Sequence, residues 1–174
     1  MRFSNIYANV VMKQANTAEQ GGGFVSQIHQ ASTLKMTRCV FSGSITKDWT
    51  DSANKGVAGM LGGSWSDYAQ NVYMNNCINY ADITSTGSAG GFFGNYRGNN
   101  PKSGSYGFRT LEVINCINYG DITSTNLDAG GFFGYFNTNP NATNNFKYNV
   151  NYGNINGKRA GAFGGCFAMP SNSS

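Results

Sequence analysis

The chain is organised around the stretch CINYGDI at residues 116–122, which is followed by AGGFFG at residues 129–134. The same pair of motifs occurs one unit earlier, as CINYADI at residues 77–83 and AGGFFG at residues 89–94. Three looser copies are CVFSGSI (39–45) with AGMLG (58–62), NVNYGNI (149–155) with AGAFG (160–164), and YANV (7–10) with GGFV (22–25). Internal repetition therefore covers nearly the whole chain, and both fold and function must be interpreted against it.

The length of the repeat varies while its motifs stay fixed. The first residues of the four clearer copies, at positions 39, 77, 116 and 149, are 38, 39 and 33 residues apart. This variation places the insertions in loops and keeps the strands in register. We assign a single domain with units at about 1–31, 32–63, 64–94, 95–134 and 135–174.

Each unit contains three short pieces with the composition of β-strands. One is the Gly-Gly-Phe-Phe piece, one precedes the cysteine, and one runs from Asn-Tyr through Ile. These pieces are rich in β-branched or aromatic residues and are bounded by Gly, Asn or Ser, and the glycine density leaves no helix of ten residues. We therefore predict an all-β fold, a right-handed parallel β-helix (β-solenoid) of four to five coils with about three strands per coil and long loop insertions. Equivalent residues should then lie about 4.8 Å apart.

The alternation of GGFFG with NCINYGDI resembles the GLUG-motif repeats of large bacterial and protist surface proteins. The resemblance covers four or five units, nearly the full length. It implies a solenoid, and it implies a role as a stalk, adhesin or spacer. The long loops of this chain depart from the compact copies of that family and leave room for a binding surface.

The composition favours an extracellular or cell-surface protein. Of 174 residues, 24 are glycine and only 11% are charged, and Asn, Ser and Thr take the place of charged residues. The net charge of +4 is scattered without a basic run, which argues against nucleic acid as a partner. The N-terminal residues lack the apolar run of a signal peptide, and no stretch approaches the roughly 18 apolar residues of a membrane span. Asn141 and Asn172 begin two glycosylation sequons.

Three cysteines share one repeat position, namely Cys39, Cys77 and Cys116. We interpret them as a ladder of small buried thiols in the core. Disulfides between adjacent coils would need a dihedral angle that in-register parallel strands disfavour. No Cys-x-x-Cys or His pairing accompanies them, so neither a metal nor another cofactor is predicted. Cys166 stands apart, as a further core thiol or an intermolecular contact.

Two carboxylates, Asp82 and Asp121, are also repeat-equivalent and would lie on neighbouring coils. Paired carboxylates act as acid and base in polysaccharide-cleaving enzymes. Because Ser44, Asn154 and Asn9 fill the same position elsewhere, a side-chain ladder or turn explains them without catalysis. The single histidine, His29, has no nucleophile placed beside it by any motif. We therefore do not predict an enzyme.

The glycine-rich runs are not phosphate loops, because no Lys-Ser/Thr follows them and no helix begins there. We expect their glycines to adopt positive φ at the corners of the solenoid, with the aromatic side chains stacked inside. The expected corner glycines are Gly23, Gly59, Gly91, Gly131 and Gly161.

Loop aromatics form a candidate contact surface. They would stack on sugars, bind a partner chain, or fold back on the flank of the solenoid. The candidates are Trp65, Tyr68, Tyr96, Tyr106, Phe108, Tyr135 and Phe136.

The strongest functional indication lies at the two ends of the repeat array. A solenoid normally needs capping units, and neither end shows an amphipathic cap. We expect the edges to be covered by neighbouring copies stacked head to tail, or by further coils of a longer solenoid. The expected edge residues are Phe3, Ile6, Val10, Phe163 and Phe167.

The sequence therefore predicts a structural subunit of an extracellular filament or an adhesin stalk segment, whose partner is itself. A carbohydrate-binding module using the loop aromatics is the alternative, with glycans as partners. A β-helical polysaccharide lyase or hydrolase comes third.

Overall fold

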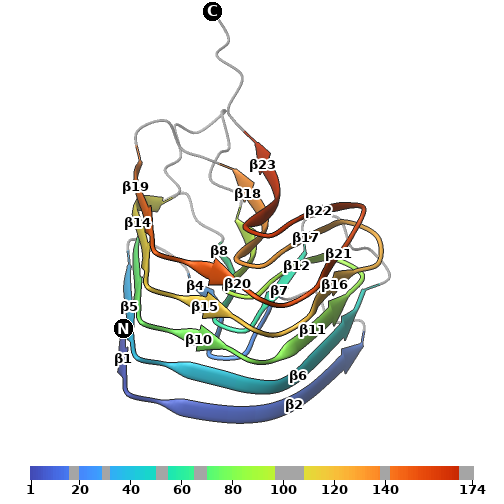
Figure 1. Cartoon of the computed structure of the whole chain (residues 1–174), viewed down its shortest axis with the longest axis horizontal. Coiled ribbons are helices and arrows are strands. Elements are labelled where there is room, and N and C mark those ends of the chain that lie inside the picture. Colours follow the sequence, from blue (N-terminus) through green and yellow to red (C-terminus); the bar gives the residue numbers. More distant parts are fainter. Residues whose placement is uncertain are drawn as a thin grey trace, which may run out of the picture.

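The protein is a parallel β-solenoid, as the sequence predicts. The computed structural model describes residues 1–15, 20–28, 32–49, 55–64, 70–96, 108–137 and 142–168. All strand pairs in these ranges are parallel, and the coils stack from the blue N-terminal coil to the red C-terminal coil in Figure 1. The path from β1 to β19 makes four complete turns, and the chain then continues through a fifth coil.

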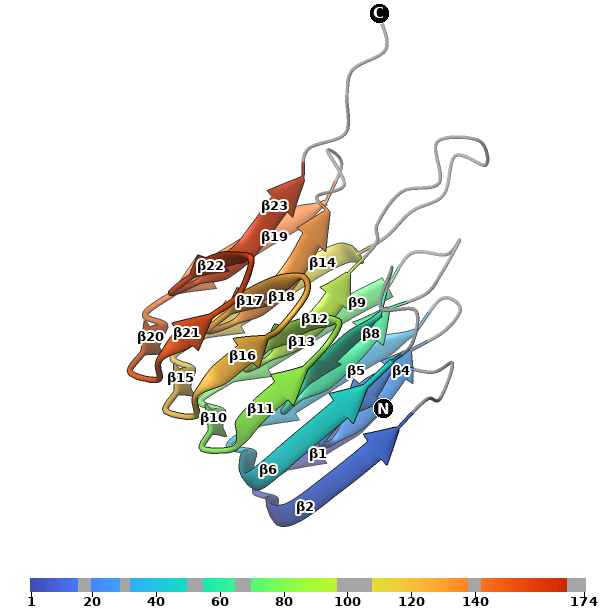
Figure 2. The same cartoon turned by 90° about the vertical axis from the view of Figure 1, so that its right-hand side faces the viewer.

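Four parallel sheets form the walls of the solenoid, and Figure 2 shows their strands stacked coil on coil. Sheet A contains β1 (Arg2–Ser4), β5 (Thr33–Thr37), β9 (Gln70–Asn75), β14 (Phe108–Ile114) and β19 (Thr143–Lys147). Sheet B contains β2 (Tyr7–Ala15), β6 (Val40–Asp48), β10 (Ile78–Asn79), β11 (Asp82–Ser85), β15 (Ile117–Asn118), β16 (Ile122–Ser124), β20 (Val150–Asn151) and β21 (Ile155–Asn156).

The other two sheets flank the glycine-rich motif. Sheet C contains β3 (Gly21–Gly22), β7 (Gly56–Ala58), β12 (Ser88–Gly90), β17 (Asp128–Gly130) and β22 (Arg159–Gly161). Sheet D contains β4 (Val25–Ile28), β8 (Leu61–Ser64), β13 (Phe93–Tyr96), β18 (Phe133–Asn137) and β23 (Gly164–Ala168). Coils 1 to 5 are accordingly β1–β4, β5–β8, β9–β13, β14–β18 and β19–β23. Three of the predicted unit boundaries fall inside strands β8, β13 and β18.

Each coil has more strands than the three that the sequence pattern predicts. The Gly-Gly-Phe-Phe piece is a corner between two strands, because β12 ends at Gly90 and β13 begins at Phe93. Neighbouring side chains of one straight strand point to opposite faces. Phe92 and Phe93 are both buried, at 0% and 2% exposure, which requires the chain to bend between them.

A second corner, between sheets A and B, is formed by residues with positive φ. The φ angles of these residues lie between 51° and 57°, in the left-handed region that Asn tolerates better than most residues. They are Asn5, Arg38, Asn76, Asn115 and Tyr148, one in each coil immediately before the cysteine position.

The prediction of positive φ for the corner glycines is wrong. Among the glycines of the described ranges, only Gly43, with φ of 104°, lies in the left-handed region. The predicted corner glycines are needed instead because the next coil leaves no room for a side chain. A Cβ on Gly91 would overlap the carbonyl oxygen of Gly131 and lie 2.5 Å from Oδ1 of Asn118.

The register also corrects one member of that set. Gly161 pairs with Gly130, so the residue of coil 5 that occupies the corner is the following one, Ala162. We call this column the corner position, and it comprises Gly23, Gly59, Gly91, Gly131 and Ala162.

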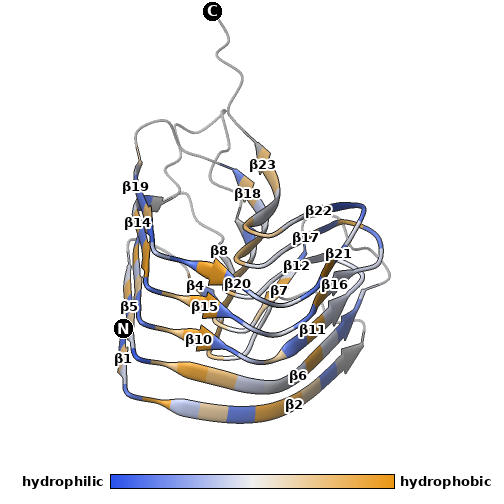
Figure 3. Ribbon diagram, in the orientation of Figure 1, coloured by the Kyte–Doolittle hydropathy of each residue, from blue (hydrophilic) through white to orange (hydrophobic). Residues whose placement is uncertain are grey.

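The core is a single apolar column through the coils. Side chains of all four sheets and of the C–D corner fill it, and Figure 3 shows apolar residues recurring at the same place in successive coils. Phenylalanine rings stack along it: Phe92 on Phe132, and Phe93 on Phe133, each pair with ring centroids 4.7 Å apart. The described residues form no helix, so none of their segments is a helical candidate for crossing a membrane.

We predict that Gly91→Ala lowers the free energy of unfolding by about 1–3 kcal/mol, because the added methyl group overpacks the contact between coils 3 and 4. Urea unfolding followed by circular dichroism measures this change. Ala162→Gly is the matched control, since no described coil covers that residue, and it should change stability by at most about 1 kcal/mol. A neutral Gly91→Ala variant would contradict the close packing at this corner.

Candidate functional site

A ladder of buried asparagines crosses three coils. Nδ2 of Asn79 donates to Oδ1 of Asn118 at 2.7 Å, and Nδ2 of Asn118 donates to Oδ1 of Asn151 at 2.7 Å. Each amide also donates to a carbonyl two residues along its own chain; for Asn118 this is Gly120, at 2.8 Å. Asn79 and Asn118 are fully buried. The ladder therefore satisfies its amides within the core and fixes the turn that follows in each coil.

The sequence analysis missed this ladder, although the three asparagines are identical at one repeat position. We call the column the ladder position; in coils 1 and 2 it holds Ala8 and Phe41. A Cβ on Gly59, Gly91 or Gly131 would collide with the asparagine of the next coil, and one on Gly23 would collide with the ring of Phe41. The side chain at the ladder position thus always lies over the corner position of the coil before it.

The three predicted cysteines lie in one buried column. Cys39, Cys77 and Cys116 are free thiols with 0% exposure. Each Sγ donates to a carbonyl two residues earlier, at 3.6, 3.5 and 3.3 Å respectively. Burial raises the pKa of the Cys39 and Cys116 thiols, which suppresses the reactive thiolate. The hydrogen bond with Cys116 lowers the pKa of the Cys77 thiol, but Cys77 is as completely buried as the other two, so the column packs and bonds without presenting a nucleophile to solvent.

Cys166 lies apart, on β23, and is half-buried. Burial also raises the pKa of its thiol. The described residues include no cluster of three or more His, Cys, Asp or Glu side chains suited to hold a metal ion. His29 lies outside the described residues.

The repeat-equivalent carboxylates bind backbone rather than each other. Oδ1 of Asp82 accepts the N–H of Asp121 at 2.9 Å, and Oδ1 of Asp121 accepts the N–H of Asn154 at 2.8 Å. Both carboxylates are on the exposed face of sheet B. The pair thus extends the bonding between coils along the outside, in the manner of a side-chain ladder.

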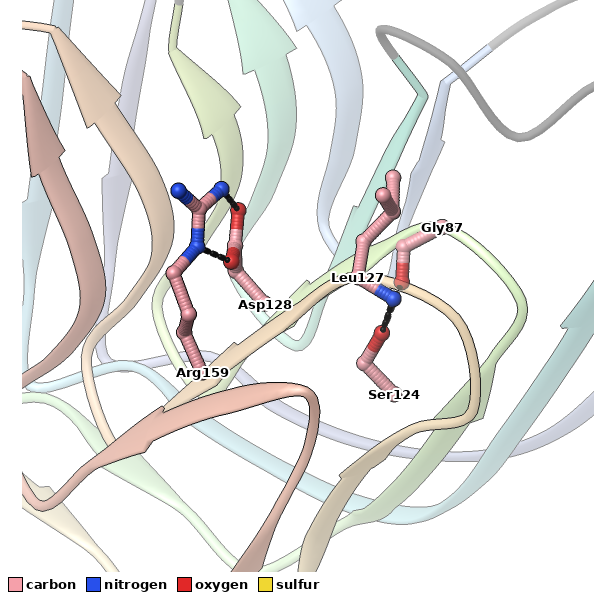
Figure 4. Close-up of polar contacts among 5 residues, drawn as sticks. All are labelled: Gly87, Ser124, Leu127, Asp128 and Arg159. Atoms are coloured by element: carbon pink, nitrogen blue, oxygen red, sulfur yellow. Dashed lines mark hydrogen bonds and ion pairs between the residues drawn. The ribbon is translucent and has the colours of Figure 1, made fainter.

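An ion pair joins coil 4 to coil 5, as Figure 4 shows. Nε and Nη2 of Arg159 donate to the two oxygens of Asp128 at 2.5 and 2.9 Å. The Asp128 side chain is 3% exposed, whereas that of Arg159 is 58% exposed. This bidentate geometry raises the pKa of Arg159 and holds the outermost described coil against the stack. Nearby, Oγ of Ser124 accepts the N–H of Leu127 at 3.0 Å and donates to the carbonyl of Gly87 at 2.7 Å.

One predicted glycan contact is a core residue. Phe136 is 2% exposed, and its ring packs 4.8 Å from that of Phe133, so it has no face available to a sugar. The prediction took it for a loop residue, but β18 continues through it to Asn137. Tyr135, on the opposite side of the same strand, is half-buried.

The other predicted loop contacts lie outside what the structure describes. Trp65, Tyr68 and Tyr106 are outside the described residues, as are the sequon asparagines Asn141 and Asn172. Tyr96 and Phe108 belong to strands β13 and β14, but their side chains are not described.

A stack of exposed tyrosines lies on sheet B. The rings of Tyr80 and Tyr119 are 4.9 Å apart and nearly parallel, and those of Tyr119 and Tyr152 are 5.1 Å apart. Tyr119, in the middle of the stack, has both ring faces covered, and Tyr80 and Tyr152 each have one face covered. Such a stack reinforces the coil spacing and offers little platform for a sugar ring.

The two outermost coils expose apolar side chains that inner coils bury. Phe136 of coil 4 is 2% exposed, whereas its equivalent in coil 5, Phe167, is 46% exposed. Phe163 is only half-buried, whereas its coil-4 equivalent Phe132 is 1% exposed. At the other edge, Phe3 is half-buried, and Ile6 and Val10 are 37% and 39% exposed. Within the described part of the chain, no strand pairs with the outer edge of either coil.

The hydrogen-bond pattern at the A–B corner gives these edges opposite polarity. At each junction the positive-φ residue donates its N–H to the following coil, as Asn115 does to Lys147, at 3.0 Å. Two residues further on, the direction reverses, as when Val150 donates to Cys116 of the preceding coil, at 3.0 Å.

If the same pattern is extended beyond the outer edge of coil 5, that edge carries an outward N–H at Tyr148 and an outward carbonyl at Asn149. The pattern leaves coil 1 with the complementary carbonyl at Ser4 and N–H at Tyr7. One edge is therefore the hydrogen-bonding complement of the other.

Comparisons with protein-family models, with curated proteins and with solved structures find nothing that matches this chain. The resemblance to GLUG-motif repeats stays a prediction.

We predict that Asn118→Ala lowers the free energy of unfolding by on the order of 3 kcal/mol. The change leaves the amide of Asn79 and the carbonyl of Gly120 without their buried partners, each at a cost of about 1–3 kcal/mol. The measurement is urea unfolding. Asn126→Ala, at an exposed position between β16 and β17, is the control and should change stability by less than about 0.5 kcal/mol. Equal effects of the two changes would argue against the ladder.

We predict that one thiol, Cys166, reacts with a disulfide reagent such as DTNB in the native protein. The other three should react only after unfolding, because they are buried and hydrogen-bonded. A spectrophotometric thiol titration with and without denaturant measures both classes. Cys166→Ser should abolish the native reaction, and a second fast thiol would contradict the burial of the column.

Proposed function

We propose that this chain is a structural protein that assembles head to tail, coil 5 of one copy receiving coil 1 of the next, in an extracellular filament or surface stalk. The observation that supports this proposal best is the complementarity of the two outer edges. Each supplies the backbone donors and acceptors that the other lacks, in the register of the internal coils. Contacts of this kind are heterologous and do not close, so they propagate into fibres.

The apolar columns of the two edges also match. In the register of the internal coils, Phe146 of coil 5 would face Phe3 of the next copy. Ile155 would likewise face Met12. These side chains are only partly buried against the core within one copy. Stacking would complete their burial, and apolar burial is the main driving force of such association.

The size of the edge suits a specific contact. The described part of coil 5 is residues 142–168. Its length falls within the range of about 20–30 residues that each partner contributes to an interface of standard size. Its charged residues are Lys147, Lys158 and Arg159, and those of the described part of coil 1 are Arg2 and Lys13. In the stacked register each of Arg2, Lys13, Lys147 and Arg159 would face an uncharged residue. Because both edges are basic, salt should favour assembly by screening their repulsion.

The low charge of the chain and the burial of three of its four thiols away from oxidants suit an extracellular position. The carboxylates Asp82 and Asp121 bond to backbone, which favours a structural role over catalysis. The exposed tyrosines are stacked on each other, which favours self-association over sugar binding.

We predict that Ala162→Lys abolishes assembly while leaving the internal coils folded. Ala162 is exposed at the outer edge of coil 5, so the longer charged side chain would block an incoming coil without entering the core. Sedimentation velocity over a range of concentrations at about 0.15 M salt, with electron microscopy of the assemblies, measures the effect. The wild-type protein should form fibres with an axial spacing of about 4.8 Å per coil.

Asn126→Lys is the charge-matched control, because Asn126 is exposed on the side of coil 4. It should assemble as the wild-type protein does. A wild-type protein that remains monomeric under all these conditions, or an Ala162→Lys variant that still forms fibres, would refute head-to-tail assembly.

A further inference from the structure

At the corner position, the contact between successive coils restricts the size of the residue. In coils 1 to 4 this position is glycine, and the ladder side chain of the next coil lies directly over it. A Cβ on Gly91 or Gly131 would lie 2.5 Å from Oδ1 of the asparagine above, where real Cβ contacts essentially never occur. A glycine at the corner therefore permits a large side chain at the ladder position of the following coil.

Coil 5 breaks this rule, because its corner residue is Ala162. Its methyl group occupies the space that the carboxamide of Asn151 takes over Gly131 one coil earlier. A coil with asparagine or phenylalanine at the ladder position would collide with this methyl group. Only a coil with a small ladder residue avoids that collision.

Coil 1 is the one described coil with a small residue there, Ala8, in register with Phe41 of coil 2. We propose that Ala162 and Ala8 form a selective junction that admits coil 1 of a second copy onto coil 5 and rejects the asparagine-bearing coils. This inference rests on the head-to-tail assembly proposed above and names the residues that set its register. It explains why the ladder starts with alanine and the corner column ends with alanine.

The junction is also looser than an internal contact. A Cβ at the corner position overlaps the carbonyl oxygen of the corner residue in the next coil, as it would between Gly131 and Ala162. At the junction, the carbonyl of Gly23 from the second copy would meet the methyl group of Ala162. The small ladder residue Ala8 avoids the collision between the methyl group and a ladder side chain. The collision with the carbonyl of Gly23 remains, and the two coils must move apart at the corner to relieve it. Assembly is therefore weaker than the stacking of coils within one copy.

The test is a cycle of four proteins, namely the wild type, Ala8→Asn, Ala162→Gly and the double variant. The measurement is the apparent association constant from sedimentation velocity. Ala8→Asn should weaken assembly by on the order of tenfold or more, because the carboxamide meets the methyl group. Ala162→Gly should strengthen assembly several-fold, because it relieves the carbonyl contact.

The double variant should assemble at least as well as Ala162→Gly. Its carboxamide at position 8 has room over the new glycine and accepts from Nδ2 of Asn151, which continues the asparagine ladder across the junction. Rescue of this kind separates a contact at the junction from damage to coil 1, because damage would persist in the double variant. Ala160→Gly, two residues away in the same strand as Gly161, is the control for added backbone freedom and should not strengthen assembly.

The outcomes separate this inference from the proposed function. If the wild type assembles and Ala8→Asn assembles equally well, or if the double variant is not rescued, the alanine junction is refuted and head-to-tail assembly stands. If the wild type does not assemble, head-to-tail assembly fails, and the junction fails with it.

Discussion

The close approach of successive coils at the corner between sheets C and D is the constraint on which the rest of the structure depends. There the carbonyl and the ladder side chain of one coil occupy the space where the preceding coil would carry a Cβ. Glycine at this position lets the coils come together at strand spacing. That spacing in turn lets the asparagine amides reach from coil to coil at 2.7 Å and the phenylalanine rings stack at 4.7 Å.

The buried asparagine ladder and the exposed ladders of aspartates and tyrosines have different structural roles. The buried asparagines form hydrogen bonds between coils and also fix the turn after each ladder residue. Each side chain therefore sets both the alignment of its coil with the next coil and the backbone conformation of its own turn. The exposed aspartates and tyrosines repeat the coil spacing on the outer face. The asparagines and the tyrosines favour identical residues in register, because each side chain bonds or stacks with its own copy one coil away, whereas the aspartates accept from the backbone of the next coil.

This repetition changes toward both ends of the stack. Asparagine gives way to Phe41 and Ala8 toward the first coil, and the corner glycine becomes Ala162 in the last. The Asp128–Arg159 pair lies at the edge of sheet C where coils 2 and 3 carry Gly56 and Ser88. Differences from the repeat thus gather at the edges, where a coil faces something other than its equivalent, and these positions rather than the repeated ones bear on what the solenoid contacts.

The sequence by itself determined the parallel solenoid and the column of Cys39, Cys77 and Cys116. It could do so because a repeat in register places like residues in one column whatever the detailed path. The tertiary structure alone decided which columns point inward and where the chain bends. Adjacent Phe92 and Phe93 look like part of one strand until their common burial shows a corner, and Phe136 looks like a loop residue until its strand is seen to continue. The role of the corner glycines was equally hidden, because the atoms that exclude a Cβ there belong to the next coil, about 30 to 40 residues further along the chain.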